Sequence, residues 1–154
     1  MLASNPIIIK RTDSNDPDFQ SLVVLLDADL ANRDGELHAV YSPHNKLKYI
    51  DTVLTAYLDD VPVGCGAFKA FNDTSVEVKR MFVKPDARGN GIAKLVLKEL
   101  ELWAAEKGFI YTTLETGKKN PEAVNLYQKQ GYHLIDNYGP YIGMDNSICM
   151  QKTL

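Results

Sequence analysis

The chain has 154 residues, of which 45% are hydrophobic and 24% charged, and a formal net charge of −3 at pH 7. A chain of this length is expected to fold as one domain, residues 1–154, with a hydrophobic core of its own. The slightly acidic balance argues against nucleic acid as the main partner, because a phosphate backbone demands a basic face. No apolar run approaches the roughly 20 residues that a membrane span needs, so we expect no membrane partner.

Cys65 and Cys149 both stand in strand-like contexts, where two cysteines are typical of small buried core residues rather than of a disulfide. The first six residues lack the charged and apolar regions of a signal peptide. We therefore expect a cytoplasmic protein. The sequence has no Cys/His cluster with metal-ligand spacing, and we expect no metal.

In the first half, residues 7–11 read as a strand and Asp16-Pro17 opens a helix. Residues 32–48 have only a weak hydrophobic pattern, which predicts a loop that could contain a second short helix. Residues 52–59, 63–71 and 75–83 read as three strands joined by tight turns, which predicts an antiparallel meander. Alternation along the third of these strands places Glu77, Lys79 and Met81 on one face.

The second half begins with the strongest helical pattern of the chain, which ends at Lys107-Gly108. Its expected apolar stripe consists of Ile92, Leu95, Val96, Leu100 and Trp103. A strand over 111–114, a helix and strands over 132–135 and 147–152 follow. The strand, long helix and strand between residues 76 and 114 predict a parallel pair inside a mainly antiparallel sheet.

Residues 76–93 indicate function most directly. A β-type run breaks at Pro85, passes a turn that holds Gly89 and Gly91, and enters the long helix. Backbone N–H groups at a helix N-terminus point outward without internal partners, and the helix dipole adds partial positive charge. The two glycines let a ligand approach the backbone, and Arg88 adds a cation. The expected guest is a phosphate or a pyrophosphate.

The spacing excludes two familiar phosphate-binding motifs. The chain contains no Gly-x-x-x-x-Gly-Lys-Ser/Thr string, as a P-loop requires. Residues 89–94 lack the third glycine of a dinucleotide-binding turn, and they follow antiparallel strands rather than an opening βαβ unit. A purely structural turn before a helix remains the plain alternative.

Arg88, Gly91 and Ala93 form Arg-x-x-Gly-x-Ala, which resembles the pyrophosphate-loop motif of the GNAT superfamily of acyl-CoA-dependent N-acyltransferases. A second block resembles that family as well. It consists of Asn120-Pro121-Glu122-Ala123-Val124-Asn125-Leu126-Tyr127 followed by Gly131-Tyr132. Asn120 suits the N-cap of this helix, Pro121 its first position and Gly131 its C′ position, where Tyr127 and Tyr132 would pack in a Schellman cap. The two motifs stand in the family's order, as do the predicted elements.

The resemblance implies an α+β (mixed α/β) GNAT fold: a mostly antiparallel twisted sheet of 6–7 strands, splayed between the fourth and fifth strands and flanked by about four helices. It also implies acetyl-CoA as cosubstrate, lying in the gap between residues 75–83 and 111–115. Backbone groups of Met81, Phe82 and Val83 would pair with the pantetheine arm. The N–H groups of Arg88, Gly89, Asn90, Gly91, Ile92 and Ala93 would hold the pyrophosphate, with Asn120 and Tyr127 as further cosubstrate contacts. Lys84, Lys118 and Lys119 are either the cations for the remaining phosphate or a solvated surface.

The implied reaction is direct attack of an amine on the thioester, with no Cys or Ser nucleophile. An alkyl amine with a pKa near ~10 is mostly protonated at neutral pH, and freeing it costs roughly 4 kcal/mol. We expect Glu77 to take that proton, with Glu115 as the second candidate; either could instead be an ordinary exposed strand carboxylate. Tyr127 matches the family's general-acid tyrosine, whose phenol protonates the departing thiolate.

The family builds the acceptor site from the loop after the first helix and from the last two strands. That implies residues 33–41 and 136–146 here, with the aromatic and turn residues of 137–143 as a wall. Amino acid, polyamine, aminoglycoside and protein lysine all remain open as acceptors. The expected function is N-acetylation of a small-molecule primary amine; the alternatives are a protein N-acetyltransferase and a non-catalytic acyl-CoA sensor. Family members often dimerise, so a homodimer is possible.

Overall fold

The computed structural model describes residues 6–34 and 48–154. Within them it has three α-helices: α1 (Pro17–Asp34), α3 (Ile92–Glu106) and α4 (Pro121–Lys129). Two short 3-10 helices, η3 (Pro85–Ala87) and η4 (Gly139–Tyr141), interrupt loops. The expected short helix within 32–48 and most of the expected acceptor segment 33–41 lie outside the described residues.

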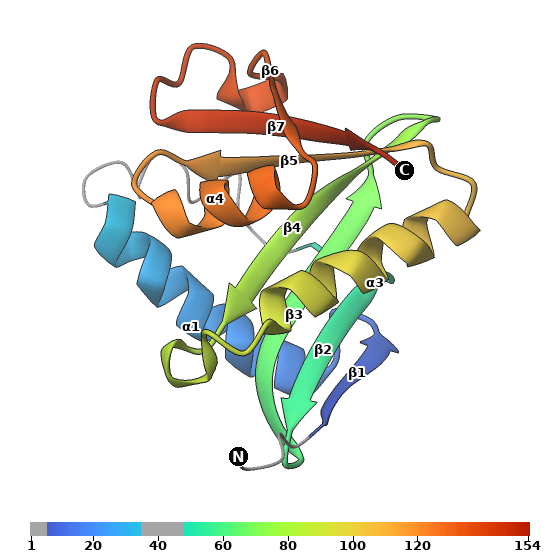
Figure 1. Ribbon diagram of the computed structural model, residues 1–154, viewed down its shortest axis with the longest axis vertical. Helices are drawn as coiled ribbons and strands as arrows, with labels where there is room; N and C mark the ends of the chain where they lie inside the picture. The colour runs from blue at the N-terminus through green and yellow to red at the C-terminus, as the bar shows by residue number, and fades with distance from the viewer. Residues whose placement is uncertain (1–5, 35–47) are drawn as a thin grey trace.

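One seven-stranded sheet carries the fold (Figure 1). Its strands are β1 (Ile7–Thr12), β2 (Val53–Leu58), β3 (Val61–Ala70), β4 (Ser75–Val83), β5 (Tyr111–Gly117), β6 (His133–Ile135) and β7 (Ser147–Thr153). They lie in the order β1-β2-β3-β4-β5-β7-β6, and only β4 and β5 run parallel. The predicted meander and the predicted parallel pair are therefore confirmed. β5 continues three residues beyond the expected 111–114, because it pairs with β7 as far as Gly117 and Ser147.

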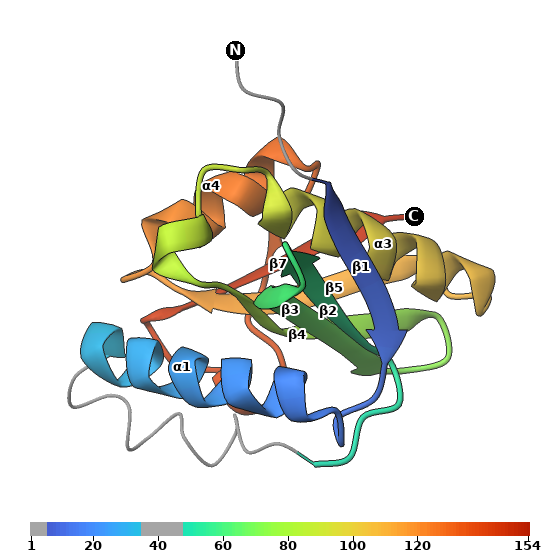
Figure 2. The same cartoon turned by 90° about the horizontal axis from the view of Figure 1, so that it is seen from below.

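The helices form a layer on each face of the sheet. α1 covers one face, and α3 and α4 cover the other (Figure 2). The core on the α1 side contains Phe19, Leu22 and Phe82, and the larger core on the α3 side contains Val96, Leu100 and Met150. Burial of these side chains supplies the driving force for folding, at about 1.5–3 kcal/mol for each large residue.

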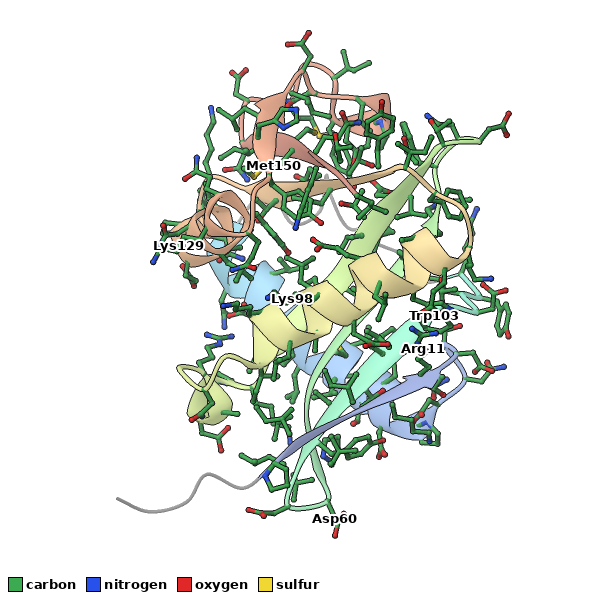
Figure 3. All side chains as sticks on the ribbon, turned by 45° about the vertical axis from the view of Figure 1, so that its right-hand side comes forward. Arg11, Asp60, Lys98, Trp103, Lys129 and Met150 are labelled. Atoms are coloured by element: carbon green, nitrogen blue, oxygen red, sulfur yellow. The ribbon has the colours of Figure 1, made fainter. Side chains whose placement is uncertain are left out.

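The buried face of α3 differs from the expected stripe. Leu97 is wholly buried, whereas Leu95 is 41% exposed. The helix contacts the sheet along Ile92, Val96 and Leu100, and this row of i, i+4 positions turns Leu97 inward and Leu95 outward. Trp103 packs only partly against the core, with the guanidinium of Arg11 4.8 Å from its ring centre (Figure 3).

A β-bulge in β4 overturns the expected alternation of its side chains. Arg80 has a φ of 61°, and the pairing register between β3 and β4 shifts at this point. Because a bulge adds one residue to one strand, the side chains that follow change faces. A Cβ at Gly66 would lie 2.7 Å from Sδ of Met81 and 2.8 Å from Val96, which places Met81 on the α3 side. Glu77, before the bulge, therefore faces α1.

The sheet opens next to this bulge. β4 pairs with β5 only from Ser75–Tyr111 to Val78–Leu114, and beyond Val78 the two strands separate. The predicted splay between the fourth and fifth strands is thus present. It leaves the second half of β4 without β5 as a neighbour, directly before the glycine turn.

Candidate active site

The loop between β4 and α3 has the geometry of an anion-binding turn. Gly89 and Gly91 have φ values of 85° and 76°, a left-handed conformation that glycine adopts without strain. Gly91 is the N-cap of α3, so the first N–H groups of the helix lack intrahelical partners. A Cβ at either glycine would meet no protein atom within 4 Å, so this backbone is approachable. Arg88 folds back, and its Nε donates to the carbonyl of Val83 at 2.9 Å.

A cavity of about 330 Å³ opens beside this loop, between the end of β4 and α4. It gathers nearly all the residues expected to bind the cosubstrate: Met81, Phe82, Val83, Arg88, Gly89, Gly91, Ile92, Ala93, Asn120 and Tyr127. Asn90 does not line it; its side-chain amide donates to the carbonyl of Ala87 at 2.9 Å. Lys94 does line it, whereas the expected cations Lys84 and Lys118 do not. The sequence signal that could have identified Lys94 is its position in the first turn of the helix that follows the two glycines.

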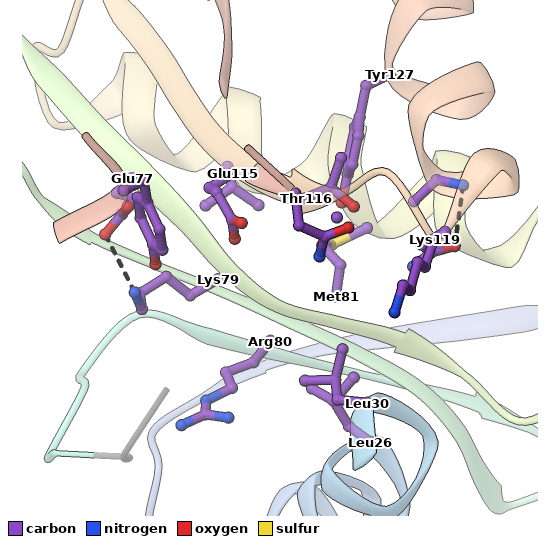
Figure 4. A pocket seen from close by; sticks show the side chains of 16 residues that line it. Leu26, Leu30, Glu77, Lys79, Arg80, Met81, Glu115, Thr116, Lys119 and Tyr127 are labelled. Carbon is purple, nitrogen blue, oxygen red and sulfur yellow. Dashed lines mark hydrogen bonds and ion pairs between the residues drawn. The ribbon is translucent and has the colours of Figure 1, made fainter. Parts of the chain in front are cut away.

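A second cavity, of about 130 Å³, lies at the splay (Figure 4). Its polar lining includes Glu77, Lys79, Arg80, Glu115, Lys119 and Tyr141. Five residues line both cavities: Leu26, Met81, Asn120, Ala123 and Tyr127. The two cavities therefore meet at the splay, where Met81 and Tyr127 form part of both walls.

Tyr127 is held in place by the end of α4. The N–H of Tyr132 donates to the carbonyl of Tyr127 at 3.0 Å, and that of Gly131 to the carbonyl of Gln128 at 3.1 Å, which together make the predicted Schellman cap. The two tyrosine rings pack edge to face, 5.7 Å apart. At the other end of the helix, the side chain of Asn120 caps the N–H of Ala123 at 3.3 Å. Burial, with the nearby charge of Glu115, raises the pKa of Tyr127 well above its ordinary value.

Glu77 is not the exposed strand carboxylate that was the plain alternative. It is only 6% exposed. Lys79 Nζ donates to its Oε1 at 3.2 Å, and the hydroxyl of Tyr138 donates to its Oε2 at 2.7 Å. Glu115 lies on the neighbouring strand, and Figure 4 shows its carboxylate and the Tyr127 hydroxyl both projecting into the cavity. Both candidate bases thus share one cavity with the candidate acid.

The sequence did not point to Arg80, a lining residue of this cavity whose bulged backbone has a positive φ and whose guanidinium extends to Asp27 of α1. A bulge depends on the pairing of two strands, so no local pattern indicates it. From the expected acceptor segment 136–146, Tyr141 and Asn146 line the cavity, and Tyr138 reaches it through Glu77. His133 is exposed on β6 and takes no part.

The residues that the structure describes include no group of three or more His, Cys, Asp or Glu side chains that could hold a metal ion. No helix within residues 6–34 and 48–154 combines the length and the apolar character that crossing a membrane requires.

A glycine turn at a helix N-terminus, opening onto a splayed sheet with a buried tyrosine at the opening, defines a class of protein that binds a phosphate-bearing cosubstrate beside a proton donor. The chain matches the family model described as acetyltransferase (GNAT) family over residues 19–132. It is 34% identical to the IAA acetyltransferase of Azospirillum brasilense over 151 residues, which cover 93% of this chain and 97% of that protein. The chain belongs to the acetyltransferase (GNAT) family.

Solved structures agree with this assignment. A Klebsiella pneumoniae protein described as an acyl-CoA N-acyltransferase is 27% identical, with a TM-score of 0.79 over 96% of this chain and 97% of that one. A GNAT family acetyltransferase from Elizabethkingia anophelis, solved with acetyl-CoA bound, is 20% identical, with a TM-score of 0.69 over 96% of this chain and 98% of that one. The expected family, fold class and acetyltransferase activity are therefore confirmed.

Proposed function

We propose that this chain transfers the acetyl group of acetyl-CoA to a primary amine of a small molecule, by direct attack through a tetrahedral intermediate. The observation that carries the proposal is the position of Tyr127, in the wall shared by the two cavities. A cosubstrate in the larger cavity and an acceptor in the smaller one would meet at this phenol.

The larger cavity supplies the contacts that acetyl-CoA needs. The pyrophosphate would bind the N–H groups of residues 88–93 at the start of α3, where the helix dipole favours an anion. Beyond Val78, β4 no longer pairs with β5, so the pantetheine arm would add to its edge at Met81–Val83 as a strand would. An N–H group of this edge would also hold the thioester carbonyl and stabilise the oxyanion as it forms.

Two proton transfers complete the reaction. Glu77 or Glu115, directly or through water, would take the proton of the acceptor ammonium. Each oxygen of Glu77 accepts one hydrogen bond from the described residues, and a carboxylate oxygen has capacity for a second. When the intermediate collapses, Tyr127 would give its proton to the departing thiolate. Because burial raises the pKa of Tyr127, the phenol stays protonated at neutral pH and available as an acid.

A small acceptor suits the size of the smaller cavity, about 130 Å³. The name of the Azospirillum relative, IAA acetyltransferase, also points to acetyl transfer that involves a small molecule. Among the candidate acceptors, a protein lysine would have to enter this cavity at the end of its long side chain.

The test is calorimetric titration with acetyl-CoA beside CoA and ATP, followed by thiol release across a panel of amines and lysine peptides. The proposal expects acetyl-CoA binding that ATP does not displace, and thiol release with small amines. Binding with turnover only on peptides would replace it by protein acetylation, and binding without any turnover by a sensor role. Absence of acetyl-CoA binding would refute the proposal.

A further inference from the structure

We infer that the acceptor amine carries a carboxylate and that Arg80 binds it. This inference rests on the proposed function, because it concerns the acceptor cavity of that reaction. It selects an amino-acid-like acceptor over a polyamine or an aminoglycoside.

Arg80 is a buried cation with incomplete pairing. Its side chain is 5% exposed, and it extends from β4 toward α1. Its Nη1 lies 3.3 Å from Oδ1 of Asp27, whose own side chain is 53% exposed. Its Nε is buried and has no hydrogen-bond partner among the described residues. Within residues 6–34 and 48–154, the guanidinium therefore makes one long contact, with Asp27, and leaves one buried donor, Nε, unsatisfied.

A guanidinium has five N–H donors in a planar fork that matches a carboxylate with two parallel hydrogen bonds. A buried donor without a partner destabilises the protein, because it has lost water and gained nothing in return. A ligand carboxylate would give Arg80 the further acceptor atoms that it lacks among the described residues, beside its ion pair with Asp27.

The other charged side chains of the cavity determine the orientation of the bound acceptor. Lys79 and Tyr138 already donate to Glu77, so the nearest carboxylate on β4 does not neutralise Arg80. Glu115 lies at the splay with Tyr127, which is the side where an amine must attack the thioester. An acceptor would thus lie with its carboxylate toward Arg80 and α1, and its amine toward Glu115. A polyamine would instead bring a second cation toward a buried guanidinium, which is unfavourable.

The first experiment compares amino acids with their own carboxamides. α-, β- and ω-amino acids, each beside its amide, are titrated into the protein saturated with CoA, and thiol release is measured with acetyl-CoA. At neutral pH an α-amino acid amide has more free amine than the acid, because its amino group is less basic. A preference for the acid therefore cannot come from the reactivity of the amine. We expect the best acid to bind on the order of 10- to 100-fold more tightly than its amide.

The second experiment changes Arg80 itself. Arg80→Gln should remove the preference for the acid and leave the amide's affinity unchanged, while Arg80→Lys, which keeps the charge, should retain part of the preference. Lys98→Gln removes one positive charge from the exposed face of α3, away from both cavities, and should retain all of it. Acetyl-CoA affinity and thermal unfolding of each variant identify any general loss of structure.

The outcomes separate the two proposals. Amides or polyamines that bind as tightly as the acids overturn the inference and leave the acetyltransferase proposal intact. A preference for the acid that survives in Arg80→Gln also overturns it. Tight, Arg80-dependent binding of acids without thiol release from acetyl-CoA supports a carboxylate site at Arg80 but refutes the proposed reaction, and with it the role of the bound acid as acceptor.

Discussion

The hydroxyl of Tyr138 donates a 2.7 Å hydrogen bond to Oε2 of Glu77, and so joins the segment before β7 to the middle of β4. The ring of Tyr138 also packs edge to face against Phe71, 4.9 Å between centres, and against Tyr141 at 5.8 Å. Burial and the charge of Glu77 raise the pKa of Tyr138, so its phenol remains a donor at neutral pH. This contact fixes the direction of the Glu77 carboxylate, which lines the candidate acceptor cavity.

Glu77→Gln and Glu115→Gln, made separately, should identify the general base. The amide cannot take a proton, so the variant at the true base should lose on the order of 10²- to 10⁴-fold in kcat/KM at neutral pH. Its loss should shrink as the pH rises, because the amine then deprotonates without help. Steady-state rates across pH check this. Tyr138→Phe is the matched control: it frees Glu77 of one hydrogen bond but keeps the carboxylate, and should cost far less. Equal, small losses in both variants would contradict a carboxylate base.

Tyr127→Phe should lower kcat by about 10²-fold or more, because the thiolate then departs without a proton donor. The phenyl ring keeps its packing on Tyr132, so acetyl-CoA affinity and thermal stability should change little. Steady-state rates measure the loss of kcat, and calorimetric titration with acetyl-CoA measures any change in affinity.

Tyr132→Phe controls for the loss of a hydroxyl in the same cap. Its phenol bonds Thr112 at 2.7 Å and Glu101 at 2.9 Å on the core side, so its removal should cost about 1 kcal/mol of stability and leave kcat intact. Equal losses of activity in the two variants would mean that any missing hydroxyl in this cap disturbs the site, and would contradict a specific acid role for Tyr127.

Gly91→Ala should weaken acetyl-CoA binding and also destabilise the fold. A left-handed φ costs a residue with a Cβ roughly 1–2 kcal/mol, and this Cβ would project where the phosphate approaches. Gly108→Ala is the matched control at the other end of α3, with a φ of 93° and likewise no protein atom within 4 Å of a Cβ. Both variants should unfold more easily in denaturant, but only Gly91→Ala should lose acetyl-CoA affinity. Unchanged affinity in Gly91→Ala would remove the glycine turn from the cosubstrate site.

Both cysteines should be inert to thiol reagents in the folded protein. Burial raises the pKa of Cys65 to about 12 and also raises that of Cys149, so neither forms the reactive thiolate at neutral pH. Titration with a chromogenic disulfide should detect almost no thiol in native protein and both thiols in denaturant. Rapid reaction of the native protein would contradict this, and it would also disturb the thiol-release assay.

We expect Asp16 to make the free energy of unfolding decrease as the pH falls into the acid range. Burial tends to raise its pKa, but hydrogen bonds from Thr12, the N–H of Asp18 and Lys10 outweigh burial and lower it. A carboxyl whose pKa is lower in the folded state contributes stability that is present above its unfolded value, near 3.8, and lost as pH falls through the folded value. Asp16→Ala should cost about 1 kcal/mol at neutral pH, because its side chain caps α1. Asp16→Asn keeps the cap without a charge, so denaturant midpoints against pH should be flatter in this variant than in the wild type.

The sequence alone determined those features whose causes are local. Asn120 and Gly131 mark the ends of α4 because a cap depends on residues within one turn of the helix. The glycine turn after β4 was predictable for the same reason, since a left-handed φ at Gly89 and Gly91 requires glycine wherever the segment lies. These local signals sufficed to indicate the family, the fold class and most of the residues that line the larger cavity.

Only the tertiary structure decided how the candidate acceptor cavity is assembled. β7 enters the sheet between β5 and β6, and it thereby brings Tyr138 and Tyr141 to Glu77 and Glu115 across many residues of chain. The bulge at Arg80 turns Met81 toward α3 and leaves a guanidinium beside α1. Both features depend on which strands pair and in which register, and those pairings are set by burial of the whole sheet between its helices rather than by any short stretch of sequence.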